Sequence, residues 1–204
     1  MTPISTDTTY DVAVILINYN SSEHTIACLS SILQHTRQDL SYGIVIVDNA
    51  SAEDDFMRLA QHIREHDSQI PLQLFRSRVN TGFAGGNMQG VQFISANYYF
   101  FLNNDCQLQN DCIGILHDFC EDHEDTALCS PQLFHEDGSH QPCFDYFPYL
   151  RTKFFGLGIL RLSYGKRYIR RKRLYTGAVQ VDVVSGSQMF VRASAFDNIG
   201  GFDT

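Results

Sequence analysis

The sequence predicts an α/β protein built on a mostly parallel β-sheet with helices on both faces. In the first half of the chain, short apolar runs alternate with stretches whose apolar residues recur at helical spacing. Each apolar run ends in a cluster of polar residues. Strands that alternate with helices are typical of a right-handed, doubly wound parallel sheet.

Four strands are predicted, at residues 12–17, 44–47, 72–75 and 98–102. The first two are rich in Val and Ile, which favour strands. The last is an unbroken apolar run that stops abruptly at Asn103. Such runs are typical of strands that are covered on both faces in a parallel sheet.

Helices are predicted between these strands. The first ends near His35 and has an apolar face made of Ile26, Leu29, Ile32 and Leu33. The second opens at Ser51, which together with Asp54 resembles a capping box. Its inward face is made of Phe56, Leu59, Ala60 and Ile63. A glycine-rich turn and helix over residues 82–97 leads to the last strand.

Polar side chains follow every predicted strand and should gather along one edge of the sheet. They are Asn18, Tyr19 and Asn20 after the first strand, Asp48 after the second, Asn80 past the third, and Asn104 and Asp105 after the fourth. In open α/β sheets, ligands bind at the carboxyl ends of the strands. A planar tyrosine ring and a carboxylate that can accept an imide N–H predict a site for a pyrimidine nucleotide diphosphate. Each residue also has a plain structural alternative, as a turn former, a packed ring or a helix cap.

Asp105 is the predicted metal ligand. Mg²⁺ or Mn²⁺ can be bound through one protein carboxylate and the phosphates of a substrate, without a cage of protein ligands. A lone aspartate at this edge is therefore sufficient.

The segment NTGFAGGNMQG, residues 80–90, matches neither of the familiar phosphate loops. It lacks the Lys-Ser/Thr pair of a Walker loop, and the spacing of its glycines does not give GxGxxG. A glycine-rich helix start still leaves backbone N–H groups open to an anion or a sugar. Close packing of the helix on the sheet is the structural alternative.

The charge balance argues against a general nucleic-acid binder. The formal net charge is −8 and the isoelectric point is about 5.3. Residues 151–173 contain nine basic and no acidic residues, so the remainder carries six basic against 23 acidic residues, a formal charge of −17.

The cysteine pattern indicates reduced thiols and a cytoplasmic protein. The chain has six cysteines, no CxxC pair and no apparent secretory leader. No apolar run approaches the length of about 20 residues that spans a bilayer.

Five ordered blocks resemble family 2 inverting glycosyltransferases of GT-A fold, and within them a bacterial rhamnosyltransferase branch. The blocks are INYNSS (17–22), IVDNAS (46–51), NTGFAGGNMQG (80–90), FLNND (101–105) and VSGSQMFVRASAFDNIGGFD (184–203). The resemblance implies one GT-A glycosyltransferase domain over residues 1–204, with a Rossmann-like, mostly parallel sheet and a basic and aromatic insertion at 140–178.

The resemblance also implies roles for individual residues. Tyr19, flanked by Asn18 and Asn20, matches the position that stacks on the nucleotide base, and Asp48 matches the acid that binds the base edge. The Asp-x-Asp motif of the family becomes Asn103, Asn104 and Asp105, so the metal contact passes to Asp105 and Asn104 lies near the ribose. The donor pocket is matched by Asn80, Gly82, Gly86 and Asn87, and the acceptor side by Ser185 and Gly186.

Members of the family continue past the last block to an acidic motif whose aspartate deprotonates the acceptor hydroxyl, whereas this chain ends at Thr204. The matching blocks give that role to neither Asp182 nor Asp203. The resemblance therefore predicts a fragment of a longer enzyme that lacks the catalytic base.

Basic and aromatic residues interleave over residues 151–173. They predict either an arm that meets a lipid-diphosphate acceptor or the anionic face of the inner membrane, or a solvated loop. RNA is disfavoured as a partner by the acidic remainder.

Two classes of function stay open. The first is a metal-dependent, inverting transfer of rhamnose or a hexose from dTDP-rhamnose or a UDP-sugar to a polysaccharide or lipid-linked glycan. The second is a catalytically silent module that binds a nucleotide-sugar or serves as a scaffold. The residues that follow Thr204 in the full protein would discriminate between them.

Overall fold

The computed structural model describes residues 4–5, 8–65, 69–147 and 169–204. They fall into two compact units: residues 1–129 with 187–204, and residues 130–186. The insertion expected at 140–178 lies within the second unit.

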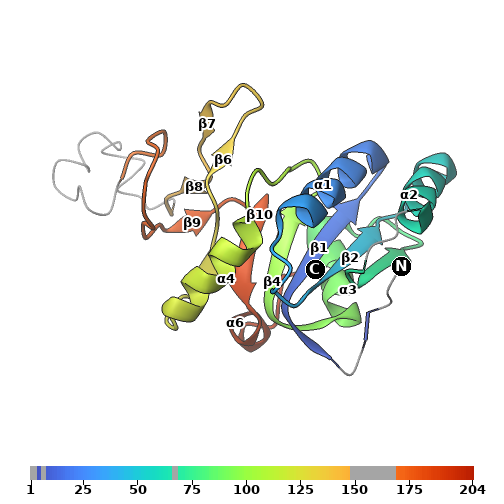
Figure 1. Ribbon diagram of the computed structural model, residues 1–204, viewed down its shortest axis with the longest axis horizontal. Helices are drawn as coiled ribbons and strands as arrows, with labels where there is room; N and C mark the ends of the chain where they lie inside the picture. Colours follow the sequence, from blue (N-terminus) through green and yellow to red (C-terminus); the bar gives the residue numbers. More distant parts are fainter. Residues whose placement is uncertain (1–3, 6–7, 66–68, 148–168) are drawn as a thin grey trace. The chain divides into compact units, whose positions relative to one another are not determined.

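The first unit is built on a six-stranded sheet with the order β3-β2-β1-β4-β10-β5 (Figure 1). Strands β1 to β4 are mutually parallel, whereas β10 runs antiparallel to both β4 and β5. The bounds are β1 Thr9–Asn18, β2 Tyr42–Asp48, β3 Leu72–Arg76, β4 Ser95–Asn103, β5 Leu128–Cys129 and β10 Gln188–Arg192. This is the mostly parallel α/β sheet that the sequence predicts.

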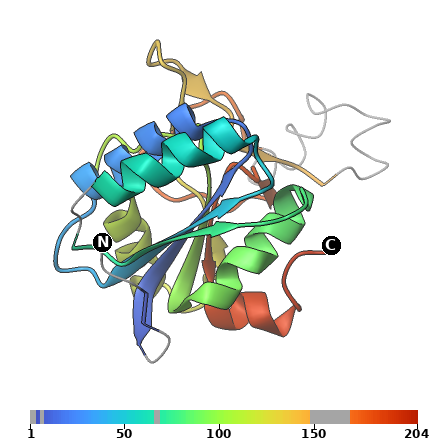
Figure 2. The same ribbon diagram turned by 90° about the vertical axis from the view of Figure 1, so that its right-hand side faces the viewer.

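Helices cover both faces of this sheet, as Figure 2 shows. One face packs against α1, α2 and α4 through a core that includes Leu29, Leu59 and Ile113. The other face packs against α3, a short 3-10 helix and α6, with Phe101 and Phe196 in its core. The bounds are α1 Ser22–His35, α2 Glu53–Glu65, α3 Gly82–Gly90, the 3-10 helix Val91–Phe93, α4 Cys112–Asp122 and α6 Ala193–Asn198.

The register of the parallel strands sets where their last residues lie. Asn18 at the end of β1 pairs with Asp48 at the end of β2, and Asp48 pairs with Arg76 at the end of β3. On the other side of β1, Ile17 pairs with Asn103 at the end of β4. Four strand ends therefore meet at one edge of the sheet.

The helix predicted over residues 82–97 is too long. It ends at Gly90, and β4 already begins at Ser95. The reason is tertiary: Ser95 and Ala96 pair with Thr9 and Tyr10 of β1, which extends both strands beyond the predicted ranges.

The capping box predicted from Ser51 and Asp54 is also wrong. Because α2 begins at Glu53, Ala52 is the residue before the helix. The hydroxyl oxygen of Ser51 accepts hydrogen bonds from Asn18 Nδ2 and Asn20 N, at 3.1 and 2.9 Å, and so belongs to the sheet edge.

The described residues of the second unit form two small antiparallel ribbons. Strand β6 (Leu133–Phe134) pairs with β7 (His140–Gln141), and β8 (Phe144–Asp145) pairs with β9 (Val183–Val184). A small core of Cys143, Phe144 and Tyr146 lies within this unit.

Residues 148–168, which hold most of the predicted basic arm, lie outside the described part of the chain. Of the remaining basic residues, Arg171 forms an ion pair with Asp145 at 3.2 Å. Among the described residues, no helix is both long and apolar enough to cross a bilayer.

Candidate functional site

Asn18 is the centre of a buried hydrogen-bond network at the sheet edge. Its Nδ2 group donates to Asp48 Oδ1 at 2.9 Å, to Ser51 Oγ at 3.1 Å and to Asp55 Oδ2 at 2.9 Å. Its Oδ1 accepts a hydrogen bond from Thr25 Oγ1 at 2.7 Å. One amide side chain thus joins the ends of β1 and β2 to the starts of α1 and α2.

Asp48, at the end of β2, is completely buried. Besides the contact with Asn18, its Oδ2 accepts the backbone N–H of Ser51 at 3.2 Å, and Arg76 Nε lies 3.7 Å away. A buried carboxylate needs such partners, because desolvation disfavours its charge. In this structure, Asp48 therefore connects the end of β2 to Asn18 and to the turn that carries Ser51.

Asp55 reaches from α2 to the first turn of α1. Its Oδ1 accepts the backbone N–H of Ser22 at 3.0 Å, at the N-terminus of α1. Burial alone would raise the pKa of Asp55, but the hydrogen bonds from Asn18 and Ser22 outweigh it and lower the pKa.

Replacing Asp55 with asparagine is expected to destabilise the protein by about 1–3 kcal/mol at pH 7, because one N–H of the new amide would face a donor. The lowered pKa means that the stabilising effect of Asp55 is present above its unfolded pKa of about 3.9 and is lost as the pH falls through the folded value. Urea unfolding at pH 7 and pH 3 measures this difference. The neighbouring exposed Asp54→Asn is the control, and a cost that is equal at both pH values would contradict the assignment.

Asn104, just past β4, joins the same network from the opposite side. Its Nδ2 donates to Ser21 Oγ at 2.7 Å and to Thr25 Oγ1 at 2.8 Å. Since Thr25 in turn donates to Asn18, the end of β4 is linked to the end of β1 through the first turn of α1. The predicted residues Asn18, Asp48 and Asn104 are therefore brought together.

The turn after β2 carries backbone strain beside this network. Ala50 has φ 64°, in the left-handed region that non-glycine residues rarely occupy. Asn20 also has a positive φ of 50°, and its Oδ1 accepts the backbone N–H of Ala52 at 2.8 Å. Backbone strain of this kind clusters at ligand sites.

An open cavity of about 520 Å³ lies beside these turns, lined by Ala50, Ser51, Arg76, Ser77 and Arg78. The Arg76 guanidinium lies 4.3 Å above the ring of Phe56, donates to Glu53 at 2.6 Å and donates to the Ser51 carbonyl at 3.2 Å. Arg76 is thus held in one orientation, whereas Arg78 is exposed. The cavity thus places the ion-paired Arg76 and the exposed Arg78 next to polar backbone.

Asn49, directly after β2, connects the end of that strand to the glycine-rich segment. The Asn49 Nδ2 group donates to Asn80 Oδ1 at 2.9 Å and to the Gly82 carbonyl at 3.1 Å. The Asn49 Oδ1 atom accepts the backbone N–H of Thr81 at 2.9 Å. Gly82 has φ 70°, which explains a glycine at this turn. These contacts place Asn80 and Gly82 beside the turn that follows β2.

Helix α3 then packs closely on the sheet. A Cβ on Gly86 would lie 3.0 Å from Ile17 Cδ1, so a side chain here would require the Ile17 side chain of β1 to shift. Asn87 is buried, and its Nδ2 donates to the Phe83 carbonyl at 2.9 Å. Within the described part of the chain, Asn87 Oδ1 has no hydrogen-bond partner.

Tyr19 and Asp105 are exposed, unlike the buried Asn18 and Asp48. The Tyr19 ring is 51% exposed directly after β1, and the Asp105 carboxylate is exposed directly after Asn104. A ring with an open face can stack on a planar base. An exposed carboxylate at a sheet edge suits a divalent cation, whose remaining ligands are substrate phosphates.

The residues predicted on the acceptor side, Ser185 and Gly186, belong to the second unit. Within that unit, the backbone N–H of Ser185 donates to the Cys143 carbonyl at 2.7 Å, and Gly186 is exposed. Their predicted role stays a prediction.

Sequence reasoning missed several polar residues of the network or cavity, among them Thr25, Asn49, Asp55, Arg76 and Arg78. Three of them carry a readable signal, because Asn49, Arg76 and Arg78 lie at or just past predicted strand ends, as do the residues that were found. Thr25 and Asp55 lie inside helices, and only the packing of α1 against α2 shows their role.

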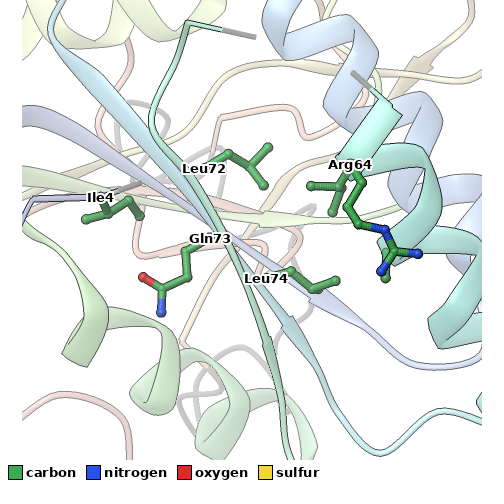
Figure 3. Close-up of a pocket in the computed structure, with 7 residues that line it drawn as sticks. Ile4, Arg64, Leu72, Gln73 and Leu74 are labelled. Atoms are coloured by element: carbon green, nitrogen blue, oxygen red, sulfur yellow. The ribbon is translucent and has the colours of Figure 1, made fainter. Parts of the chain in front are cut away.

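A second cavity, of about 340 Å³, lies at the outer edge of β3. In Figure 3, Leu72 and Leu74 project from one side of the strand, while Gln73 and Ile4 lie on the other. Its lining is mostly apolar, with Arg64 as its charged side chain. This chemistry does not suit a diphosphate with a cation, so the polar edge at the strand ends is the candidate site.

The chain belongs to glycosyl transferase family 2, since the model of that family matches residues 13–200. With its mixed six-stranded sheet, the protein has the GT-A fold that the sequence predicts. Among proteins with curated functions, none matches this sequence.

Three solved structures illustrate the similarity of fold. Residues 1–349 of TarS from S. aureus align with a TM-score of 0.62 at 13% identity, over 95% of this chain and 50% of that one. The mannosyltransferase PcManGT from Pyrobaculum calidifontis, in complex with GDP-Man and Mn²⁺, aligns with a TM-score of 0.60 at 15% identity, over 99% of this chain and 50% of that one. A complex of TarS with UDP gives 0.55 at 15% identity, over 66% and 39%. The chain thus spans half or less of the length of these proteins.

Proposed function

We propose that the polar edge of the sheet binds a nucleotide-diphosphate sugar, and that the protein transfers the sugar to a glycan or lipid-linked acceptor with inversion. The observation that carries this proposal is the meeting of four strand ends around Asn18, flanked by the exposed Tyr19 and Asp105. Membership in glycosyl transferase family 2 supports the same class of reaction.

The base of the donor is proposed to lie between the Tyr19 ring and the cavity beside Ala50 and Ser51. The turn that carries Tyr19 is joined to that cavity, because the backbone N–H of Asn20 donates to Ser51 Oγ. Asp48, whose Oδ2 accepts the backbone N–H of Ser51 beside this cavity, is assigned to the edge of the base. We assign Asn104 to the ribose side and the turn of Asn80 and Gly82, with Gly86 and Asn87 of α3, to the rest of the donor.

Asp105 is proposed to hold Mg²⁺ or Mn²⁺. Such a cation, when bound, would neutralise charge on the diphosphate leaving group. Among the described residues, no group of three or more His, Cys, Asp or Glu side chains could hold a metal by itself. This fits a cation that is shared between one carboxylate and substrate phosphates.

The donor is proposed to be dTDP-rhamnose or a UDP-sugar, on the resemblance of the motif blocks to the rhamnosyltransferase branch. Ser185 and Gly186 are assigned to the acceptor side. We also propose that the protein acts in the cytoplasm, with residues 151–173 as the segment that would meet a membrane-bound acceptor.

Nucleotide affinity tests the proposal directly. Isothermal titration calorimetry with dTDP, UDP and GDP should show binding that is tighter with Mn²⁺ than without it. Asp105→Asn should weaken binding in the presence of Mn²⁺ by about tenfold or more, since even indirect metal contacts are worth that much. Tyr19→Ala should weaken binding with and without the metal.

The control is Asp125→Asn, which removes another exposed carboxylate from the same unit. Equal affinity in wild type and Asp105→Asn would contradict the metal assignment. If no nucleotide bound to the wild type, the proposed function itself would be wrong. If nucleotide bound but the full-length protein transferred no sugar, the silent binding module would be the correct alternative.

A further inference from the structure

Two cysteines that the candidate site does not use lie next to each other in the first unit. Cys120 Sγ, in the last turn of α4, is 3.5 Å from Cys129 Sγ in β5. Both are free thiols in this structure; Cys120 is buried and Cys129 is partly buried. Two further thiols, Cys112 and Cys106, come from the start of α4 and the loop before it.

The surroundings of the pair favour a thiolate. Arg192 Nη2 donates to the Cys120 carbonyl at 2.7 Å, so the guanidinium is held at the end of α4. The hydrogen bond from the Cys129 thiol lowers the pKa of Cys120 against the effect of burial, and the Arg192 charge lowers it further. The pKa of Cys129 is raised, because its proton is held in that hydrogen bond and its sulfur is desolvated.

We propose that Cys120 and Cys129 form a redox-active thiol pair that peroxide converts to a disulfide linking α4 to β5. The Cys120 thiolate, which the hydrogen bond from Cys129 favours, attacks one oxygen of hydrogen peroxide, the O–O bond breaks, and a sulfenic acid and hydroxide are formed. The hydroxide takes the proton of the Cys129 thiol and leaves as water. The Cys129 thiolate then attacks the Cys120 sulfur and expels the sulfenic oxygen, which takes a proton from solvent and leaves as water. In total, two thiols and one peroxide give one disulfide and two waters.

Such a disulfide would stabilise the attachment of strand β5, which makes few contacts with the rest of the sheet. Strand β5 has two residues, and in the ladder it pairs with β10 through Leu128 and Cys129 alone. Leu128 is 42% exposed, so burial adds little to holding the strand. The disulfide would close a short ring around residues 121–128 and reduce the freedom of the unfolded chain, which stabilises the folded state.

Cys112 is the rival partner, because its charge also contributes to raising the pKa of Cys129. The observation that distinguishes the two pairings is the direct contact of 3.5 Å between Cys120 and Cys129. The mass of the linked peptides identifies the pairing without reference to activity.

The test treats the whole chain with increasing hydrogen peroxide, blocks the remaining thiols and maps disulfides by mass spectrometry. We expect one disulfide per chain at low peroxide, a mass lower by two hydrogens, and a linked peptide pair that contains Cys120 and Cys129. The melting temperature should rise by about 5 °C and return on addition of dithiothreitol. Amide hydrogen exchange over residues 121–128 should slow in the oxidised protein.

Cys129→Ser should abolish the disulfide and the rise in melting temperature, while Cys143→Ser, which changes a buried thiol of the second unit, should leave both unchanged. Disulfide mapping of the wild-type protein shows which cysteines pair, even if a variant fails to fold. A disulfide between Cys112 and Cys129, or over-oxidation of Cys129 with Cys120 still reduced, would overturn the proposal.

Discussion

Replacement of Asn18 by aspartate is expected to destabilise the protein by about 3–5 kcal/mol at pH 7, although the two side chains have nearly the same shape. The Nδ2 group of Asn18 supplies hydrogen bonds to the carboxylates of Asp48 and Asp55 and to Ser51 Oγ. An aspartate would remove both N–H donors, and with them all three hydrogen bonds, and place a third carboxylate beside two others in a buried site. Like charges at such distances raise the pKa of the new carboxyl in the folded state.

The destabilisation caused by Asn18→Asp is expected to depend on pH. A carboxyl whose folded pKa lies above the unfolded value of about 3.9 destabilises the protein above that value, and the cost disappears as the pH falls below it. The gap in unfolding free energy between wild type and Asn18→Asp should therefore narrow from pH 7 to pH 4. Urea denaturation followed by circular dichroism measures both ends of that range.

Asn20→Asp is the matched control, two residues further on. Asn20 is exposed, and the contact that its side chain makes here is as an acceptor from the Ala52 backbone N–H, which a carboxylate preserves. We expect a change within about 0.5 kcal/mol, as for most surface substitutions. Similar costs for the two variants would mean that Asn18 is not the centre of the network.

Phe190→Ala is expected to cost about 3–5 kcal/mol, the range for truncation of a fully buried aromatic side chain. Phe190 is completely buried in β10. Its ring stacks on Tyr98 with centroids 5.0 Å apart and lies 5.9 Å from the ring of Phe100, its partner in the β-ladder. Its loss would leave a cavity where the antiparallel strand joins the parallel part of the sheet.

The measurement is again urea denaturation, with Leu128→Ala as control. Leu128 lies in the adjacent strand β5 and is 42% exposed, so its truncation should cost less than about 1 kcal/mol. A cost for Phe190→Ala no larger than for Leu128→Ala would show that β10 is not needed to hold the core together.

The strands and the class of fold could be predicted because their signals are local. The apolar runs at 44–47 and 98–102 are continuous, as a strand covered on both faces requires, and both are strands in the structure. The helix over residues 82–97 was overextended because nothing local ends it at Gly90. The pairing of Ser95 and Ala96 with β1, far away in the sequence, made those residues a strand.

For the candidate site, the residues could be predicted from the sequence, but their contacts could not. Which strand ends carry Asn18, Asp48, Asn104 and Asp105 can be read from the amino-acid sequence, since polar residues that interrupt apolar runs must lie where the strands stop. The contacts of these side chains depend instead on the folded arrangement of strands and helices. The register of β1 against β2 sets Asn18 beside Asp48, and the packing of α1 on α2 brings Asp55 to the start of α1. Register and helix packing are fixed by burial summed over the whole core, which no short stretch of sequence encodes.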